Sequence, residues 1–421
     1  MAWSRSGRVR RRPAIVGLTA LACGLMGACG GDTPSAPATP APTPPAPVPA
    51  GFLHVLQADS VFTYAIDDAT GRLRESARQS VRNAHTLAGE PQGRYVYAAY
   101  GPRSARPPYD EPHPSIVAYT PDPLTGSLAM LSEASSDPVW RSSMAVTCAW
   151  HWLSATSTRV YATWQTITYH DVYTTYVTHA VGGDGRLGAA YQQTLDEWDP
   201  EDVAVDDAGD TDAFYKGTWR GGLTAHSVEA DGRLRQMGAS DLCLASRLGP
   251  AEPLAAVRGF VFASGPVGYD RTTCSWEGPR LAPRANLGLR SDYAVALAPR
   301  GGAPSSSSAS TRTLVAMRMD TSATGQYEVR LFAVSDDGAL QMLDATTGPG
   351  WARHLLFHPS GRFLYLSLAP SRGSFSLDSL LVCSIDTQGH LGEVETLVGG
   401  GGTMAVTMPP QVRAGTGPGA D

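Results

Sequence analysis

The sequence predicts an all-β protein built from repeated antiparallel sheets. Its 421 residues include 45 glycines and 32 prolines, a turn-rich composition that fits β-structure better than helix bundles. A turn that ends in Gly-x-Leu recurs along the chain, and a strand-like segment of alternating or aromatic character precedes each copy. Together these observations indicate a chain of β-hairpins.

The first 28 residues predict a signal peptide rather than part of the fold. The apolar run PAIVGLTALACGLMGA is too short for a membrane-spanning helix but matches the central region of a secretory signal. Five arginines precede this run: Arg5, Arg8, Arg10, Arg11 and Arg12. The chain is therefore expected to be exported.

The signal ends in LMGACGGD, where Gly27 and Ala28 precede Cys29. This segment resembles the lipobox of bacterial lipoproteins, which implies that Cys29 is acylated and anchors the mature chain to the membrane. By the same pattern, Gly30 favours the outer membrane, facing the periplasm, in a Gram-negative host. A soluble secreted protein that is cut near this point is the alternative.

Residues 29–50 predict a Pro/Ala-rich linker, because DTPSAPATPAPTPPAPVPAG cannot bury apolar surface and tends to polyproline II. Removal of residues 1–28 takes away five arginines and no acidic residue, which changes the formal charge from −6 to −11. A domain this acidic is a poor partner for nucleic acid or anionic headgroups. We therefore expect membrane contact through the lipidated Cys29 and no nucleic-acid partner.

The repeated Gly-x-Leu turn has six clear copies. They are DATGRL, PLTGSL, GGDGRL, EADGRL, SDDGAL and DTQGHL, which end at Leu73, Leu128, Leu187, Leu234, Leu340 and Leu391. A degenerate copy, NLGL, ends at Leu289 inside the one double-length interval, so the spacing averages about 53 residues. Glycine allows a positive φ and aspartate caps the turn, which is the chemistry of a two-strand hairpin.

A polar turn followed by an apolar strand forms the other half of each repeat, as in PQGRYVYAAY, STRVYATW and SGRFLYLSL. The segment GFLHVLQ at 51–57 supplies this strand without the strand that should precede it, and TMAVTMPP at 403–410 can supply the missing one. Seven repeats of four strands, closed by the C-terminal strand, predict a seven-bladed β-propeller over residues 51–410. Residues 411–421 are expected to form a disordered tail.

Four segments carry a family resemblance: RHLLFHPSGRFLYLSL, LLVCSIDTQGHLGEV, YTPDPLTGSLAML and FAVSDDGALQML. They resemble the lactonase family of seven-bladed propellers, which includes bacterial 6-phosphogluconolactonases and fungal carboxymuconate-lactonising enzymes. The resemblance covers essentially all of residues 51–410. It implies a propeller fold and suggests hydrolysis of a lactone or a related cyclic ester. Since the chain is expected to be exported, a cytosolic sugar-phosphate lactone is not the expected substrate.

The innermost strands line the central channel of a propeller, so polar residues at their starts converge there. Members of the resembled family often begin such a strand with Arg-His, and this chain keeps the pair as Arg353 and His354. Lactone opening needs a base and an oxyanion partner, which would be His354 and Arg353, with Asp202 or Glu201 orienting the imidazole. His85 aligns with Arg353 and is a candidate ligand-binding residue. Alternatively, Arg353 and His354 only cap their strand and pair with the neighbouring blade.

An insertion between strands, GPRSARPPYDEPHPS at 101–115, adds the ligand-binding candidates Arg103 and Tyr109. Such a Pro-rich loop can equally be inert. His358, in the turn FHPSGRF, is expected to be a surface turn residue outside any site.

Four cysteines lie within the predicted domain, and export permits disulfides. Cys243 with Cys274 is the preferred pair, whereas Cys148 and Cys383 lie in apolar strands and are expected to be buried thiols. The chain has no G-x-S-x-G, H-E-x-x-H, C-x-x-C or P-loop motif. No bound metal and no cofactor are therefore expected.

Two functions remain open. One is a lipid-anchored hydrolase of lactones or related esters. The other is a non-catalytic propeller of the cell envelope that binds a small molecule or an envelope protein. A monomer is expected in either case.

Overall fold

The computed structural model describes residues 49–101, 114–135, 145–168, 172–195, 203–206, 212–217, 223–240, 252–264, 273–278, 280–287, 289, 291–297, 312–319, 325–371 and 379–408. The chain divides into Met1–Pro47 and Val48–Asp421, and all described residues belong to the second unit. The predicted signal peptide, nearly all of the linker and the predicted tail lie outside the described residues.

The described part of the chain is all-β, as predicted, and its strands form seven four-stranded antiparallel sheets, here called blades. Blade 1 contains β28 (Thr403–Thr407), β1 (Gly51–Gln57), β2 (Ser60–Ile66) and β3 (Leu73–Ser80). Blade 2 contains β4 (Ala84–Gly89), β5 (Val96–Tyr100), β6 (Ser115–Pro121) and β7 (Leu128–Ser135). Blade 3 contains β8 (Ala145–Ala155), β9 (Arg159–Thr168), β10 (Val172–Val181) and β11 (Leu187–Leu195).

The remaining blades repeat this order. Blade 4 contains β12 (Val203–Asp206), β13 (Ala213–Gly217), β14 (Leu223–Val228) and β15 (Leu234–Ser240). Blade 5 contains β16 (Glu252–Val257), β17 (Phe260–Ser264), β18 (Thr273–Glu277) and β19 (Ala282–Asn286). Blade 6 contains β20 (Ser291–Leu297), β21 (Thr313–Met319), β22 (Gln326–Val334) and β23 (Leu340–Pro349). Blade 7 contains β24 (Trp351–Phe357), β25 (Phe363–Ala369), β26 (Ser379–Ile385) and β27 (Leu391–Val398).

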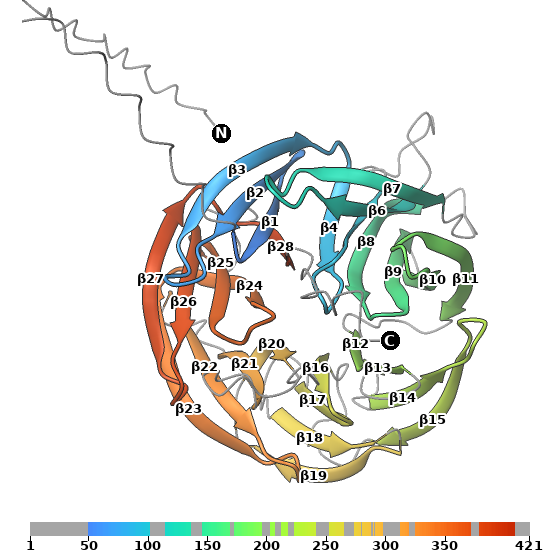
Figure 1. Cartoon of the computed structure of the whole chain (residues 1–421). Coiled ribbons are helices and arrows are strands. Elements are labelled where there is room, and N and C mark those ends of the chain that lie inside the picture. Colours follow the sequence, from blue (N-terminus) through green and yellow to red (C-terminus); the bar gives the residue numbers. More distant parts are fainter. Residues whose placement is uncertain are drawn as a thin grey trace, which may run out of the picture. The chain divides into compact units, whose positions relative to one another are not determined.

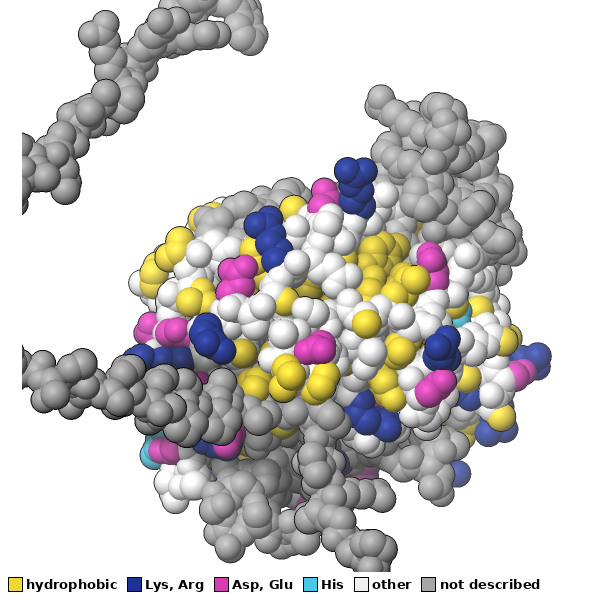
Figure 2. Space-filling view, turned by 45° about the horizontal axis from the view of Figure 1, so that its top comes forward, with side chains coloured by type: hydrophobic (Ala, Val, Ile, Leu, Met, Phe, Trp, Pro, Cys, Tyr) yellow, Lys and Arg dark blue, Asp and Glu magenta, His cyan; other side chains and the backbone are white. Residues whose placement is uncertain are grey.

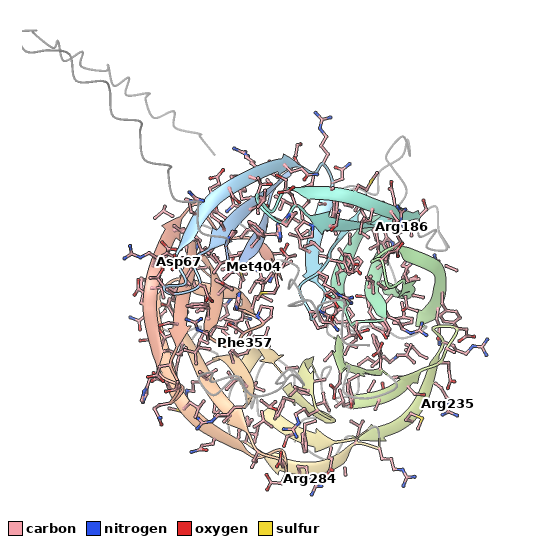
Figure 3. All side chains as sticks on the ribbon, in the orientation of Figure 1. Asp67, Arg186, Arg235, Arg284, Phe357 and Met404 are labelled. Atoms are coloured by element: carbon pink, nitrogen blue, oxygen red, sulfur yellow. The ribbon has the colours of Figure 1, made fainter. Side chains whose placement is uncertain are left out.

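Within this unit the blades stand around a common axis as a β-propeller (Figure 1). The strands β28, β4, β8, β12, β16, β20 and β24 are innermost, and the last strand of each blade lies at the rim. Figure 3 accordingly places Phe357 of β24 and Met404 of β28 toward the centre and Arg235 and Arg284 at the rim. No helix among the described residues is long and apolar enough to cross a membrane.

The N-terminal and C-terminal strands meet in blade 1. β28 pairs with β1 in antiparallel register, with Leu53 opposite Val406 and Val55 opposite Met404. The prediction that TMAVTMPP supplies the missing inner strand is therefore confirmed. β28 also contacts the inner strands β24 and β4, so it lies between the last and the second blade.

The Gly-x-Leu turns pack against the preceding blade, which explains why glycine recurs there. Gly71 and Gly185 have φ of +74° and +82°, a region that residues with a Cβ rarely adopt. A Cβ on Gly185 would lie 2.4 Å from the ring of Tyr95 in the preceding blade. The glycine of the Gly-x-Leu turn is therefore required both by the hairpin and by a contact between blades.

Polar side chains also join neighbouring blades at these turns. The backbone N–H of Leu391 donates to Asp344 Oδ2 of blade 6 at 2.7 Å, and that of Leu187 donates to Ser132 Oγ of blade 2 at 3.0 Å. The Leu73 N–H donates in the same way to Glu395 of blade 7. The apolar clusters span adjacent blades too, since one of them contains both Leu53 of blade 1 and buried residues of blade 7. Contacts with its neighbours thus help to stabilise each blade.

Candidate functional site

Five innermost strands carry one extra residue near their start, which the adjacent strand does not pair. In β24, Ala352 pairs with Leu368 and His354 with Ser367, so that Arg353 is the extra residue. The equivalent residues are His85 in β4, Val146 in β8, Leu254 in β16 and Asp292 in β20. A β-bulge of this kind bends the strand and re-aims its side chains, and such bulges are frequent beside functional sites. The predicted alignment of His85 with Arg353 is confirmed, because both occupy the bulge.

The described part of the face in Figure 2 does not indicate a rival site. On the face shown in Figure 2, basic and acidic side chains are interspersed with neutral and hydrophobic ones instead of forming one patch of a single charge. The bulged start of β24 is therefore the best candidate for a functional site.

Arg353 and His354 are both half-buried at this bulge. The pKa of His354 is lowered to about 4, mainly by burial and then by the positive charges of Arg318 and Arg353. The pKa of Arg353 is also lowered, by burial first and then by Arg318. His354 is therefore a neutral imidazole at pH 7, beside two guanidinium groups.

Arg318 of β21 and Trp351 of β24 complete the group, and the sequence reasoning missed both. Nη1 of Arg318 donates to the carbonyl oxygen of Ala352 and, at 3.4 Å, to that of Arg353. The guanidinium carbon lies 4.9 Å from the ring centroid of the buried Trp351. The sequence signal that could have pointed to Arg318 is its place as the one arginine in the apolar strand TLVAMRM, because an arginine in an apolar strand needs polar or aromatic partners.

This group, here called the arginine cluster (Arg318, Trp351, Arg353 and His354), has two chemical capacities. A neutral imidazole can accept a proton from water, and a nearby guanidinium can stabilise a developing oxyanion. The same guanidinium groups can instead hold an anionic ligand without any reaction. A pKa near 4 makes His354 a weak base, which limits the first capacity.

Of the other predicted site residues, the structure describes only His85. His85 lies in blade 2 and its Nε2 donates to the carbonyl of Gly101 in the same blade, at 3.1 Å. Asp202 and Glu201 lie outside the described residues, directly before β12, and Arg103 and Tyr109 also lie outside them.

The prediction that His358 is a surface residue is wrong. Its side chain is 1% exposed, and Nδ1 accepts hydrogen bonds from the backbone N–H and the hydroxyl of Ser360, at 3.1 and 2.7 Å. Its ring packs edge-on against Phe363, with centroids 5.7 Å apart. Glu90 heads the equivalent turn of blade 2, is 2% exposed and accepts from the Arg94 N–H at 3.0 Å. This position is buried because its side chain caps the turn from inside.

The cysteine predictions are tested only in part. Cys383 is a buried free thiol, as predicted, and burial raises its pKa to about 12. Cys274 lies in β18 opposite Ala263, but its side chain, like that of Cys148, is outside the described residues, as are Cys243 and Cys29. Within the described ranges, no three His, Cys, Asp or Glu side chains are grouped to hold a metal ion.

Comparison with known proteins supports the fold. No family model and no curated protein matches the chain. A crystal structure of a candidate 6-phosphogluconolactonase from Bacteroides uniformis superposes with a TM-score of 0.57 at 12% identity, over 85% of this chain and 100% of that one. A second from Bacteroides fragilis gives 0.53 at 13% identity, over 86% and 99%. At this identity the similarity establishes a β-propeller fold and leaves the activity open.

Proposed function

We propose that this chain is an exported, lipid-anchored, seven-bladed propeller that hydrolyses a lactone or a related cyclic ester. The observation that carries the proposal is the neutral His354 beside Arg353 at the bulge of an innermost strand. The remote similarity to candidate lactonases supports the choice of substrate class.

In this reaction His354 takes a proton from a water molecule while the water oxygen attacks the ester carbonyl. The carbonyl oxygen becomes an oxyanion, which Arg353 stabilises. The C–O bond of the ring then breaks, and the imidazolium returns its proton to the leaving alkoxide. Asp202 or Glu201 would orient the imidazole, and His85, Arg103 and Tyr109 would bind the rest of the substrate.

The test is hydrolysis of a panel of sugar and acyl lactones by the chain from residue 51 onward. His354→Gln should lower kcat/KM at least about 100-fold, because general-base catalysis contributes on this order. His390→Gln is the matched control: His390 is an exposed histidine at a rim turn of the same blade and should leave the rate unchanged. Full activity of the His354→Gln, Arg353→Gln double variant would refute these roles.

The pH profile gives a second prediction. Since His354 must be deprotonated to act as a base and its pKa is about 4, kcat/KM should fall only below about pH 4 and stay level toward pH 7. If kcat/KM instead fell as the pH dropped through about 6.5, and this fall were absent in His354→Gln, the low pKa of His354 would be contradicted.

Anchoring through Cys29 is tested separately. Cells labelled with a radioactive fatty acid should incorporate label into the full chain and not into Cys29→Ser. Label retained by the variant would contradict lipidation at this residue.

The second candidate function is a non-catalytic propeller that binds an anionic small molecule or an envelope protein. Two observations favour it: the low basicity of His354, and the hydrogen bonds that Arg318 donates to backbone carbonyls. It predicts no turnover on any lactone, together with crosslinking of one specific envelope partner in intact cells. Recovery of bulk membrane proteins alone would count against it.

A further inference from the structure

Arg318 lies on the blade next to the bulge that shapes the candidate site. Its backbone is fixed in β21 of blade 6, opposite Tyr293 and Val329 of the two neighbouring strands. Its side chain extends into blade 7, where Nη1 reaches the carbonyl oxygens of Ala352 and Arg353. These two carbonyls belong to the residue before the bulge and to the bulge residue itself.

Such a donor stabilises the bulge. An extra residue disrupts the regular ladder around it, and Ala352 is completely buried, so water cannot reach this part of the strand from its side. A buried carbonyl without a donor costs on the order of 1–3 kcal/mol. Nη1 of the Arg318 guanidinium carries two N–H groups and lies within reach of both carbonyl oxygens.

Trp351 holds the same guanidinium from another side. The centroid of its ring lies 4.9 Å from the guanidinium carbon, and the ring is 5% exposed. Stacking on a buried indole is favourable for a flat cation, which a lysine ammonium would not reproduce with the same geometry. Arg318 is thus held by its own strand, by an aromatic face and by two carbonyls.

The position of the bulge decides which way the proposed catalytic side chains face. If Arg353 entered the ladder, the residues before it would shift by one, and a shift of one residue exchanges the two faces of a strand. We propose that Arg318 is a positioning residue: it locks the bulge at Arg353 and so sets the directions of Arg353 and His354. The catalytic consequence of this inference rests on the proposed function. The effect of Arg318 on the bulge does not depend on that function.

Arg318 also sets the charge around His354. Among the described residues, two charged groups act on this imidazole: Arg318 from β21 and Arg353 from its own strand. Both favour the neutral form, so that loss of Arg318 should make His354 easier to protonate. This effect can be measured without any substrate.

The test compares Arg318→Lys and Arg318→Met with the wild-type chain from residue 51 onward. Arg330→Met is the control, because Arg330 lies on β22 of the same blade and pairs with Glu328 at 2.6 Å. NMR titration, with His354 assigned through His354→Gln, should show the pKa of His354 raised in Arg318→Met and unchanged in Arg330→Met. Arg318→Lys, which keeps the charge, should leave this pKa low but alter the amide shifts of residues 351–354, because it loses the planar guanidinium that stacks on Trp351.

On an active lactone, Arg318→Lys should lower kcat at least tenfold with KM changed less than threefold. Wild-type titration behaviour and wild-type amide shifts in Arg318→Met would overturn the inference. If the wild-type chain hydrolyses no lactone, the proposed function fails while the titration and the amide shifts still decide on Arg318. Arg318→Lys keeps the volume and charge, so it remains informative if Arg318→Met does not fold.

Discussion

His54 is a fully buried histidine at the junction of the chain's two terminal strands. Its Nδ1 lies 3.1 Å from Thr63 Oγ1 on β2, and its Nε2 lies 2.9 Å from Thr407 Oγ1 on β28. Neutral imidazole has one donor and one acceptor nitrogen, which two hydroxyl groups can satisfy. Burial lowers its pKa to about 3. His54 therefore links β1 to both neighbouring strands, and its burial favours the uncharged form.

This histidine should make the fold sensitive to acid. The unfolded state takes up a proton near pH 6.5 and the folded state only near pH 3, so the stabilising contribution is complete above pH 6.5 and is lost as the pH falls toward 3. Between pH 7 and pH 4.5 the loss amounts to about 2–3 kcal/mol. His54→Gln keeps hydrogen-bonding groups but does not titrate, so its free energy of unfolding should fall correspondingly less in this range.

Urea unfolding at a series of pH values measures this difference. The matched control is His390→Gln, which removes an exposed histidine and should keep the wild-type dependence on pH. Parallel curves for the wild-type chain and His54→Gln would contradict the assignment. His354 contributes in the same direction, since its pKa is lowered to about 4, and this contribution remains in both proteins.

At the scale of single elements, the turn at Gly185 shows how two requirements coincide. Its φ of +82° excludes most side chains, and a Cβ there would lie 2.4 Å from the ring of Tyr95. Gly325 has a similar φ of +64° but open space around it. Comparison of the two positions therefore separates backbone strain from the contact between blades.

Gly185→Ala should lower the free energy of unfolding by about 2–4 kcal/mol, since it adds a clash to the strain of a positive φ. Gly325→Ala should cost only about 1–2 kcal/mol, because strain alone acts there. Gly183→Ala, in the same turn as Gly185 and in open space, should stay within about 0.5 kcal/mol of wild type. Equal losses at Gly185 and Gly325 in urea unfolding would show that the packing against Tyr95 is unimportant.

The turns and strands were predictable because their chemistry is local. The Gly-x-Leu motif around Gly185 and its equivalents predicts hairpins from residues that are adjacent in sequence. GFLHVLQ and TMAVTMPP could be recognised as two strands that each lack a partner. The bulge at Arg353 is different in kind, because an extra residue exists only relative to the strand that it faces. His358 was misplaced for a related reason: a polar residue in a turn motif can point inward and cap the turn.

In the candidate site too, the features that are local in sequence could be predicted and those that depend on contacts between blades could not. Arg353 and His354 were found because they are adjacent in sequence and match a family pattern. Arg318 is 35 residues away from Arg353 in the chain and belongs to another blade, so only the packing of blade 6 on blade 7 reveals its role. Sequence patterns therefore indicated where a site lies but not what holds it in shape.

At the scale of the whole propeller, one short strand closes the ring: β28, the last strand of the propeller, pairs with β1, the first. Met404, Ala405, Val406 and Thr407 of β28 are all buried. Their neighbours include β1 in the same blade and the inner strands β24 and β4 on either side. Gly402 fits closely here, because a Cβ would lie 2.1 Å from the Leu56 carbonyl oxygen, and its N–H donates to Ser367 Oγ of blade 7 at 2.8 Å. The glycine run before β28 is thus packed where it meets the strand.

Removal of β28 should therefore abolish cooperative folding rather than loosen one edge. Burial of Met404 and Val406 contributes about 3–6 kcal/mol at roughly 1.5–3 kcal/mol for each side chain, which is a large share of the total stability of a typical domain. A chain that ends at Gly402 should lack a sharp urea transition and aggregate through the exposed edge of β1. A chain that ends at Met408 keeps the strand and should unfold like the wild type.

A synthetic peptide of residues 403–408, added to the chain that ends at Gly402, should restore a cooperative transition because it can pair with β1 as β28 does. A stable, cooperative fold for the chain that ends at Gly402 would mean that the contacts between the other blades suffice to hold the ring together.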